Sequence, residues 1–427
     1  MDSLAWSILF WFAAGVLAYS LCGYQILLLV LGRRSRTLSP PGRGQGEGAV
    51  ALESLQPEPV REQTLTPTLS QREREIELPE ITLIIPAYNE AAVLREKLEN
   101  ALAVDYPRDK LEILVASDGS SDETNQIAES FSDRGVHLLA FPRRRGKASV
   151  LNDAAAAAAR EVLCLCDANV MFRPDALRVL ARHMAEPRVG AVTGDVRLAS
   201  EESNFGAGES LYYRLERRLQ LAESNVGSLM GVDGGMFLIR KELFRKLPAD
   251  TILDDFVLTI EVIRQGFKVV YEPEAVADES GTPTARQEYR RRRRVSAGAV
   301  QSLKRGIWPG WRRPIEMWQY LSHKLLRWFT PLWLLLLLVA SIMLWESGWF
   351  YQAALIAQLA WFAVAAVGLV IVPARAVPLV GIPFYFMLSQ VGLVDGMIRG
   401  LFNRQSVTWQ PVDRTAGGRQ AQESVHG

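Results

Sequence analysis

Residues 81–122 read ITLIIPAYNEAAVLREKLENALAVDYPRDKLEILVASDGSSD, and this stretch decides the fold class. Two short apolar runs with several β-branched residues, Ile81–Ile85 and Leu111–Ser117, flank a segment with helical periodicity, Ala91–Ala103. A strand, a helix and a strand in this order are typical of a parallel sheet.

The same alternation continues along the chain to about residue 193. Further strands are expected at Val136–Phe141, Val162–Asp167 and Val189–Thr193, and further helices at Asp122–Phe131, Lys147–Arg160 and Pro174–Met184. The pattern predicts an α/β domain with a Rossmann-like, mostly parallel sheet and helices on both faces. Ligands bind such sheets at the carboxyl ends of the strands, so the residues that follow each strand carry the functional information.

Apolar residues before this domain predict a membrane anchor. No charged residue occurs from Ser3 to Gly32, and 30 residues of helix span about 45 Å, more than the ~30 Å hydrocarbon core. The run is too long for a cleaved signal peptide, and Asp2 stands where basic residues are expected. Arg33 and Arg34 follow at once, which favours a cytoplasmic C-terminal end.

Three more uncharged runs follow the α/β domain: Trp328–Trp345, Ser347–Ala374 and Ala376–Val394. We expect transmembrane helices here, and therefore an integral, multi-pass protein with a cytoplasmic α/β domain, at the inner or plasma membrane if the source is bacterial. Three full spans after an inward-ending anchor would put the tail outside. Four arginines after the last run favour a cytoplasmic tail: Arg399, Arg404, Arg414 and Arg419. The two placements of the tail would agree if one of the runs were re-entrant or interfacial and did not cross the membrane.

Composition divides the chain and excludes several classes. The formal net charge of +1 argues against a nucleic-acid partner, and no HExxH or Cys/His cluster predicts zinc. Residues 38–79 are rich in Pro, Gly, Ser and Gln, as flexible linkers are. The expected order is an anchor (1–32), a linker (33–79), the α/β domain (80–283), basic interfacial helices (284–325), membrane helices (326–400) and a tail (401–427).

Polar side chains follow three of the predicted strands. Tyr88 and Glu90 follow the first, Asp118 follows the second, and Asp167 and Asn169 end the fourth. Asp118 is placed to accept a hydrogen bond from a base or ribose. The oxygens of the D-x-N pair suit Mg²⁺ or Mn²⁺ bridging phosphates, although D-x-N alone is a weak signal.

The third strand is followed by the basic loop Arg143–Lys147. It is not a P-loop, because Ala148 stands where Ser or Thr is needed. Taken alone, the loop suits a diphosphate or a solvated charged surface equally well.

Two further clusters occur later in the domain. Asp233-Gly234-Gly235 leaves room for a sugar ring to approach the backbone. Asp254 and Asp255 begin a predicted helix, where they either cap it or supply a general base.

In this order, the motifs resemble the membrane-bound family 2 glycosyltransferases of GT-A fold, which include cellulose, chitin, hyaluronan and poly-N-acetylglucosamine synthases. The motifs are PAYNE (86–90), SDGSSD (117–122), GKASVLN (146–152), DAN (167–169), GDVRL (194–198), DGGMF (233–237) and LDDF (253–256). The resemblance implies inverting, metal-dependent hexosyl transfer from a nucleotide-sugar donor, usually UDP-linked, to a polysaccharide or glycan acceptor, with Mg²⁺ or Mn²⁺ as cofactor.

The resemblance also implies roles for individual residues. Donor-binding roles would fall to Pro86, Tyr88, Glu90, Asp118, Lys147 and Asp167, and metal-binding roles to Asp167 and Asn169. Asp255 would be the general base with Asp254 beside it, and the acceptor would contact Asp233, Gly234, Gly235, Gln287, Arg290 and Arg291.

This sequence departs from the family pattern at two places. Asn169 replaces an acidic metal ligand, so weaker metal binding is expected. The Q-x-x-R-W motif of processive members corresponds to Gln287–Arg291, with arginine where tryptophan would stack on the acceptor. Residues 286–313, with ten basic side chains and one acid, suit an interfacial helix on anionic lipid, and His323 and Lys324 are expected at headgroup level.

Three functions therefore remain open at this point. The first is an exopolysaccharide-type synthase that extends a chain. The second is a single-addition transferase onto a lipid acceptor such as a sphingolipid or polyprenyl phosphate, which the missing tryptophan keeps open. The third is a non-catalytic nucleotide sensor. The presence of Asp118, Asp167 and Asp255 together argues against it. An oxidoreductase is disfavoured, because no strand leads into G-x-G-x-x-G.

Overall fold

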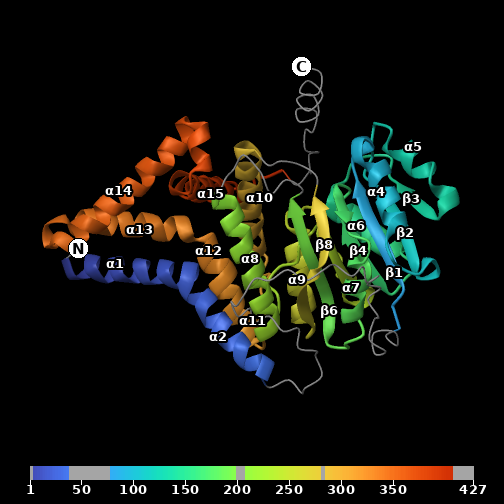
Figure 1. Ribbon diagram of the computed structural model, residues 1–427, viewed down its shortest axis with the longest axis horizontal. Helices are drawn as coiled ribbons and strands as arrows, with labels where there is room; N and C mark the ends of the chain where they lie inside the picture. Colours follow the sequence, from blue (N-terminus) through green and yellow to red (C-terminus); the bar gives the residue numbers. More distant parts are fainter. Residues whose placement is uncertain (1–2, 38–76, 199–206, 280–283, 407–427) are drawn as a thin grey trace, which may run out of the picture.

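The computed structural model describes residues 3–37, 77–198, 207–279 and 284–406. An α/β domain occupies one side of the molecule, and apolar helices project from the other (Figure 1). The two parts are joined by helices that lie between the sheet and the projecting helices in Figure 1.

One eight-stranded sheet forms the centre of the α/β domain, in the order β3-β2-β1-β4-β7-β6-β8-β5. The strands are β1 (Ile81–Ala87), β2 (Leu111–Ser117), β3 (Val136–Ala140), β4 (Val162–Cys166), β5 (Val170–Phe172), β6 (Val189–Leu198), β7 (Met236–Arg240) and β8 (Lys268–Glu279). Neighbours β3, β2, β1 and β4 run parallel, and so do β6 and β8. The predicted mostly parallel sheet is confirmed, with β7 and β5 as antiparallel additions.

Helices cover both faces of the sheet, as predicted. On one face, α4 (Ala91–Ala103), α5 (Thr124–Glu129) and α7 (Ala176–His183) share one hydrophobic cluster with alternate β1 residues such as Leu83. On the other face, α6 (Lys147–Ala157) and α9 (Asp254–Arg264) pack with Ile84. Strand β1 therefore buries both of its faces, which is why it reads as a continuous apolar run.

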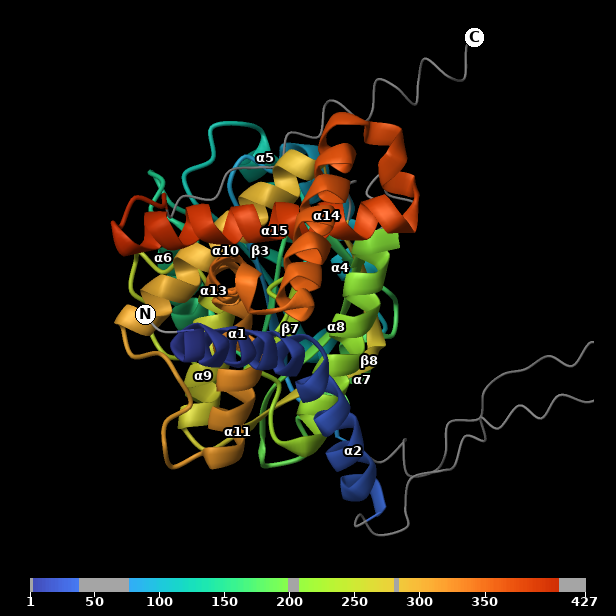
Figure 2. The ribbon, with the colours of Figure 1, turned by 90° about the vertical axis from the view of Figure 1, so that its left-hand side faces the viewer.

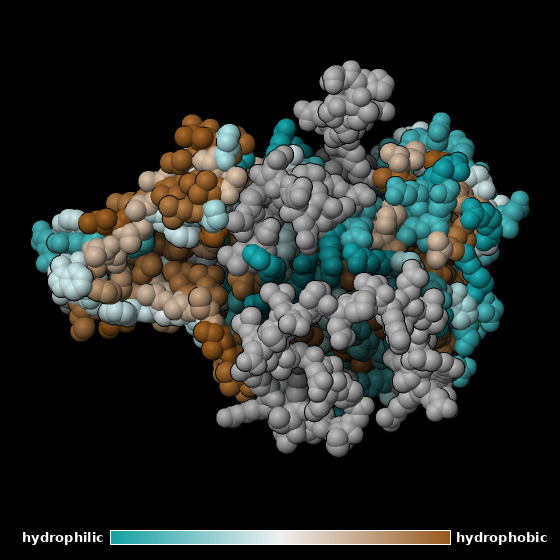
Figure 3. Space-filling model, in the orientation of Figure 1, coloured by the Kyte–Doolittle hydropathy of each residue, from teal (hydrophilic) through white to brown (hydrophobic). Residues whose placement is uncertain are grey.

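The projecting helices carry apolar side chains on their outer surface (Figure 3). They are α1 (Ser3–Ala18) and α2 (Tyr24–Thr37), joined by the π-turn η1 (Tyr19–Gly23), with α13 (Thr330–Met343), α14 (Trp349–Val370) and α15 (Pro378–Leu401). Among the described residues, three helices are long and apolar enough to cross a membrane: Ser3–Gly32, Trp349–Val370 and Pro378–Leu401. The bent pair Pro314–Trp328 and Thr330–Met343, with an angle of 61°, would make a fourth span.

Connecting helices join the two parts of the molecule. These are α8 (Ala207–Val226), α10 (Ala285–Lys304), α11 (Pro314–Gln319), the π-turn η5 (Tyr320–Leu325) and α12 (Leu326–Trp328). Short 3₁₀ turns complete the chain: η2 (Arg108–Lys110), η3 (Ser132–Arg134), η4 (Lys241–Leu243), η6 (Trp345–Ser347) and η7 (Val372–Ala376).

Helix α15 differs from the other apolar helices because it lies along α10, across the face seen in Figure 2. Three glycines at four-residue spacing, Gly392, Gly396 and Gly400, form the contact. A Cβ atom on Gly400 would lie 2.8 Å from the Cβ of Val300, and one on Gly392 would lie 2.9 Å from the Cβ of Arg292. Small residues at this spacing let two helix backbones approach closely.

The connecting segment corrects one expectation about its histidine. His323 does not lie at a headgroup surface, since only 3% of it is exposed. Its Nδ1 lies 2.8 Å from Glu223 Oε1 and its Nε2 lies 3.0 Å from Glu216 Oε1, and both glutamates belong to α8. Tyr24 of α2 donates to the same Glu223 oxygen at 2.7 Å, so this cluster joins the N-terminal helix to α8 and η5.

Candidate active site

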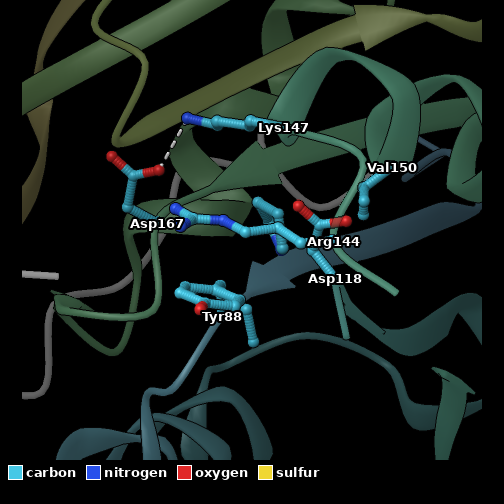
Figure 4. A pocket seen from close by; sticks show the side chains of 8 residues that line it. Tyr88, Asp118, Arg144, Lys147, Val150 and Asp167 are labelled. Atoms are coloured by element: carbon cyan, nitrogen blue, oxygen red, sulfur yellow. Dashed lines mark hydrogen bonds and ion pairs between the residues drawn. The ribbon is translucent and has the colours of Figure 1, made fainter. Parts of the chain in front are cut away.

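The ends of β1, β2 and β4 meet at one edge of the sheet because these strands are parallel neighbours. Tyr88, Asp118 and Asp167, which follow these strands, therefore border one pocket (Figure 4). The complete lining is Pro86, Ala87, Tyr88, Asp118, Arg144, Lys147, Val150 and Asp167. The structure thus brings together five of the six predicted donor-binding residues.

The sixth residue, Glu90, lies elsewhere. It is 2% exposed at the N-cap of α4, where its backbone N–H donates to Thr124 Oγ1 at 2.9 Å. Glu90 does not line the pocket, so its position is that of a residue supporting the turn after β1.

Asp118 holds the basic loop beside the pocket. Its Oδ1 accepts a hydrogen bond from the backbone of Arg145 at 2.6 Å, and its Oδ2 accepts one from Gly146 at 2.8 Å. Gly119 has a φ of 69°, and a Cβ there would lie 2.6 Å from the Arg143 carbonyl carbon. Glycine is required at this turn because the two loops touch through their backbones.

The basic loop sends its side chains to separate places. The Arg144 guanidinium lies 3.7 Å from the centre of the Tyr88 ring, in contact with its aromatic face (Figure 4). Arg144 Nε is buried and has no hydrogen-bond partner among the described residues. Arg145 instead turns outward and pairs with Asp153 at 2.6 Å. The sequence pattern did not distinguish the arginines of this loop, and of these two it is Arg144 that lines the pocket.

Lys147 connects the pocket to the two carboxylates that begin α9. Its Nζ lies 2.8 Å from Asp167 Oδ1 and 3.5 Å from Asp254 Oδ2. Burial lowers the pKa of Lys147, but the Asp167 and Asp254 carboxylates outweigh burial and hold this pKa above its usual range. Lys147 is therefore a fixed cation in the lining of this pocket.

Asp255 occupies a different environment from Asp254. Its Oδ1 accepts a hydrogen bond from the backbone N–H of Phe256 at 2.7 Å, and no described cation pairs with it. Burial raises the pKa of Asp255, and the neighbouring Asp254 carboxylate raises it further. A carboxylate of this kind is suited to accept a proton, whereas Asp254 is occupied by Lys147.

The Asp233-Gly234-Gly235 turn lies against Asp255. A Cβ on Gly234 would lie 3.3 Å from Asp255 Oδ2, so a side chain there would crowd the carboxylate. Burial raises the pKa of Asp233 to about 7, and the charges of Glu279 and Asp255 add to this rise. The predicted base and this part of the predicted acceptor set are therefore adjacent.

The remaining acceptor residues begin α10. The Gln287 side chain is engaged in a capping box, because its Oε1 accepts from the Thr284 backbone at 2.7 Å. Arg291 Nη1 donates to the Tyr213 hydroxyl of α8 at 2.6 Å, and its charge lowers the pKa of Asp233. Arg290 lies on the surface side of the helix. Of these three residues, only Arg291 is thus placed toward Asp233. Its aromatic neighbour Tyr213 was not indicated by the sequence motifs.

The predicted metal-binding pair consists of Asp167 and Asn169. No group of three or more His, Cys, Asp and Glu residues arranged to hold a metal occurs among the described residues. Asp167 offers carboxylate oxygens, and Asn169, 7% exposed, donates through Nδ2 to Glu279 Oε1 at 3.1 Å, which leaves its carbonyl oxygen available. Two hard oxygens fit a Mg²⁺ or Mn²⁺ ion that takes its other ligands from a diphosphate and water.

Comparison with known proteins agrees with this geometry. Residues 82–248 match the sequence model of Glycosyl transferase family 2. The chain is 24% identical over 256 residues to a poly-beta-1,6-N-acetyl-D-glucosamine synthase of Staphylococcus epidermidis, which covers 58% of this chain and 62% of that protein. It is 26% identical over 293 residues to a beta-monoglucosyldiacylglycerol synthase of Synechocystis, covering 64% of this chain and 60% of that protein. The chain thus spans about three fifths of the length of these relatives.

Among solved structures, the mannosyltransferase PcManGT from Pyrobaculum calidifontis, in complex with GDP-Man and Mn²⁺, superimposes with a TM-score of 0.66. The match has 23% identity and covers 93% of this chain and 100% of that one. It extends the shared fold to the helices outside the α/β domain. The predicted fold class and family resemblance are confirmed, and the chain carries a family 2 glycosyltransferase domain with a GT-A-like fold.

Proposed function

We propose that the protein is an inverting glycosyltransferase that moves a sugar from a nucleotide diphosphate donor, specifically a UDP-sugar, to an acceptor at a membrane surface. The observation that carries this proposal is the arrangement around Lys147. Its ammonium lies between Asp167, which lines the donor pocket, and Asp254, which begins α9. The next residue, Asp255, forms no ion pair with a described residue.

The donor half of the proposal rests on the pocket at the strand ends. The Tyr88 ring offers a stacking surface for the nucleobase once the Arg144 guanidinium moves aside or onto the base. Asp118 fixes the loop that would close over the nucleoside. Lys147 lies where it would meet the diphosphate, and its fixed charge would stabilise the departing nucleotide.

Asp167 and Asn169 would hold a divalent cation, Mg²⁺ or Mn²⁺, which would offset the negative charge of the leaving diphosphate. The Mn²⁺ present in the PcManGT complex supports this choice of cation. Lys147 shares the same region, so protein and cation charge would act on one leaving group.

The transfer itself would use Asp255 as the general base. Its carboxylate would accept the proton of the acceptor hydroxyl while the oxygen attacks the anomeric carbon from the face opposite the diphosphate. A single displacement of this kind inverts the configuration at that carbon. The raised pKa of Asp255 brings it closer to neutral pH, which makes the carboxylate a stronger base than an ordinary aspartate.

We propose a polysaccharide or other glycan as the acceptor, in an exopolysaccharide-type synthase. The poly-N-acetylglucosamine synthase among the relatives supports this choice, and the ring of Tyr213 beside Arg291 offers an aromatic surface. A second candidate is single addition to a lipid acceptor. Arginine at position 291 in place of an aromatic residue, together with the glycolipid synthase among the relatives, favours this alternative.

We further propose a multi-pass membrane protein whose catalytic domain and tail are both cytoplasmic. Half of the apolar window of α15 is buried inside the protein, compared with 17% for α14. Helix α15 would then lie at the interface on α10, with its exposed face, including Val391, Ile398 and Leu401, toward lipid. This arrangement removes one crossing and returns the arginine-rich tail to the inside.

The test is a donor and product screen on the full chain in lipid nanodiscs. Labelled UDP- and GDP-sugars are supplied with Mn²⁺ or Mg²⁺, with glycan and lipid acceptors in separate reactions, and the labelled product is sized. A polymer supports the synthase, and a one-sugar glycolipid supports the alternative. Nucleotide binding without product from any donor and acceptor would contradict the proposed transfer.

A further inference from the structure

Asn169 and Glu279 face each other although 110 residues separate them in the chain. Strand β5 pairs antiparallel with the end of β8, with Val170 opposite Glu279. This pairing brings the residue before β5, Asn169, to the carboxylate of Glu279, and Asn169 Nδ2 donates to Glu279 Oε1 at 3.1 Å. The contact therefore follows from the sheet, and no local motif encodes it.

Two polar side chains of α4 hold β5 in this position. Lys97, which is fully buried, donates from Nζ to the carbonyl oxygen of Val170 at 2.5 Å. Asn100 makes a pair of hydrogen bonds with the backbone of Phe172, each 2.8 Å long. The turn that carries Asn169 is consequently fixed from the side of the helix as well as by the sheet.

The hydrogen bond decides which way the Asn169 amide points. An ionised carboxylate only accepts hydrogen bonds, so the side of the amide that faces Glu279 must be its NH₂ group. The carbonyl oxygen then lies on the opposite side, where it can ligate a cation. With the amide turned over, the NH₂ group would face the cation, and an amide nitrogen with two hydrogens is no ligand for Mg²⁺ or Mn²⁺.

Glu279 also supplies negative charge that the D-x-N motif lacks. The Asp167 carboxylate is already paired with the Lys147 ammonium at 2.8 Å. Glu279 has no cation within 4.0 Å among the described side chains and is half-buried. A carboxylate next to the neutral Asn169 amide would therefore favour a divalent ion there through its charge.

We propose that Glu279 is a positioning residue of the metal site, which turns the Asn169 carbonyl toward the cation and replaces the charge that an aspartate at this position would carry. This inference rests on the metal-dependent transfer proposed above. It assigns the acidic member of the pair to β8, where the family motif has it in the D-x-D turn itself. Residues outside the ligand set that orient it typically change metal affinity by roughly 10–100-fold.

The test measures Mn²⁺ binding directly, by the electron paramagnetic resonance signal of free Mn²⁺, on the full chain in nanodiscs with UDP or, in a second arm, GDP. Glu279→Ala removes both orientation and charge, so Mn²⁺ binding should weaken by about 10-fold or more. Glu279→Gln keeps an acceptor for the Asn169 amide but no charge, so it should fall between Glu279→Ala and wild type. Glu274→Ala, at an exposed glutamate of the same strand, is the control and should bind as wild type does.

An exchange of the two side chains makes the test sharper. Asn169→Asp alone sets two carboxylates against each other, so Mn²⁺ should bind no more tightly than to wild type despite the added charge. When Asn169→Asp is combined with Glu279→Gln, the introduced glutamine amide would donate to the introduced aspartate, and binding should return to within about 3-fold of wild type. The melting temperature of each variant separates lost binding from misfolding.

Wild-type affinity in Glu279→Ala would overturn the inference while leaving the proposed function intact. So would strictly additive effects in the double variant, since these would show that the two side chains do not act as a pair. Absence of Mn²⁺ binding by the wild-type protein with either nucleotide would overturn the metal dependence of the proposed function, and the role of Glu279 with it.

Discussion

The two adjacent carboxylates Asp254 and Asp255 have different surroundings, and the different roles proposed for them rest on this difference. Asp254 is 7% exposed and lies 3.5 Å from the Lys147 ammonium. Asp255 accepts a hydrogen bond from the Phe256 backbone and has no ion pair with a described residue, although the charges of Lys147 and Arg294 lower its pKa. Lys147 in turn pairs more closely with Asp167. One lysine thus pairs with two acidic side chains and leaves a third, Asp255, available as a base.

The pH dependence of transfer should report on this arrangement. Asp255 must be ionised to act, so kcat falls as the pH drops through its pKa. The Asp254 carboxylate helps to raise this pKa, and Asp254→Asn should therefore shift the acidic limb of the kcat–pH profile to lower pH. The measurement is kcat at saturating donor between pH 5 and 8.

Glu261→Gln provides the control, because Glu261 belongs to the same helix but pairs with Arg264 at the surface. An acidic limb that stays in place in Asp254→Asn would mean that another group sets it.

Sequence alone indicated the acidic residues but not their pairing. Asp118 and Asp167 could be placed because they follow strands that lie on either side of β1 in parallel. The Lys147–Asp254 contact depends on how α6 and α9 pack on the same face of the sheet, which no short motif records. The position of Arg144 on Tyr88 depends on the two hydrogen bonds that Asp118 makes to the loop backbone.

At the scale of the elements, the glycine contact between α15 and α10 couples the membrane side to the helix that carries Arg291. Gly396 packs against the backbone of α10, and a Cβ there would lie 2.7 Å from the Cβ of Ser296. The side chain of Ser296 also donates to the carbonyl oxygen of Leu393 at 2.7 Å. The two helices therefore behave as one unit.

A large side chain at this contact should separate the helices. Gly396→Leu should lower the melting temperature of the protein in nanodiscs by several degrees, because overpacking costs about 1–3 kcal/mol or more. Val394→Leu, on the exposed side of the same helix, should leave the melting temperature unchanged. Equal melting temperatures for the two variants would show that the contact does not support the fold.

Element prediction succeeded for local patterns and failed for distant ones. Leu111–Ser117 and Ala91–Ala103 have the predicted bounds, because apolar period and polar ends are local signals. Strands β5, β7 and β8 were not predicted. Strand β5 has three residues, and all three strands pair with partners that lie far from them in the chain: β5 with β8, β7 with β4 and β6, and β8 with β6.

For the whole molecule, the position of α15 addresses a conflict that the sequence left open. Charge counting placed the tail inside, whereas counting the apolar runs as full spans placed it outside. A composition profile cannot distinguish a helix that crosses lipid from one that lies on a protein surface with an apolar outer face. The glycine contact with α10 is the observation on which the proposed interfacial placement of α15 rests.

Cysteine labelling would measure the proposed topology. Cys22 is exposed, whereas Cys164 and Cys166 are buried, so Cys22→Ser gives a quiet background. Ser406→Cys, after α15, should react with a membrane-impermeant maleimide only from the cytoplasmic side. Glu346→Cys, between α13 and α14, should react only from the opposite side.

Labelling of both cysteines from the cytoplasmic side would contradict the proposed position of the α13–α14 turn on the opposite side of the membrane. Labelling of Ser406→Cys from the outside alone would make α15 a full span and would place the tail outside.

The proposed transfer depends most on Asp255, which would act as the general base beside the donor site. The direct measurement is Asp255→Asn in nanodiscs, with Mn²⁺-dependent nucleotide binding and single-turnover transfer followed on the same sample. Binding should stay within about 2-fold of wild type, while transfer should fall by roughly 10²–10⁴-fold, the usual contribution of a general base. Transfer at the wild-type rate with binding intact would contradict this role for Asp255.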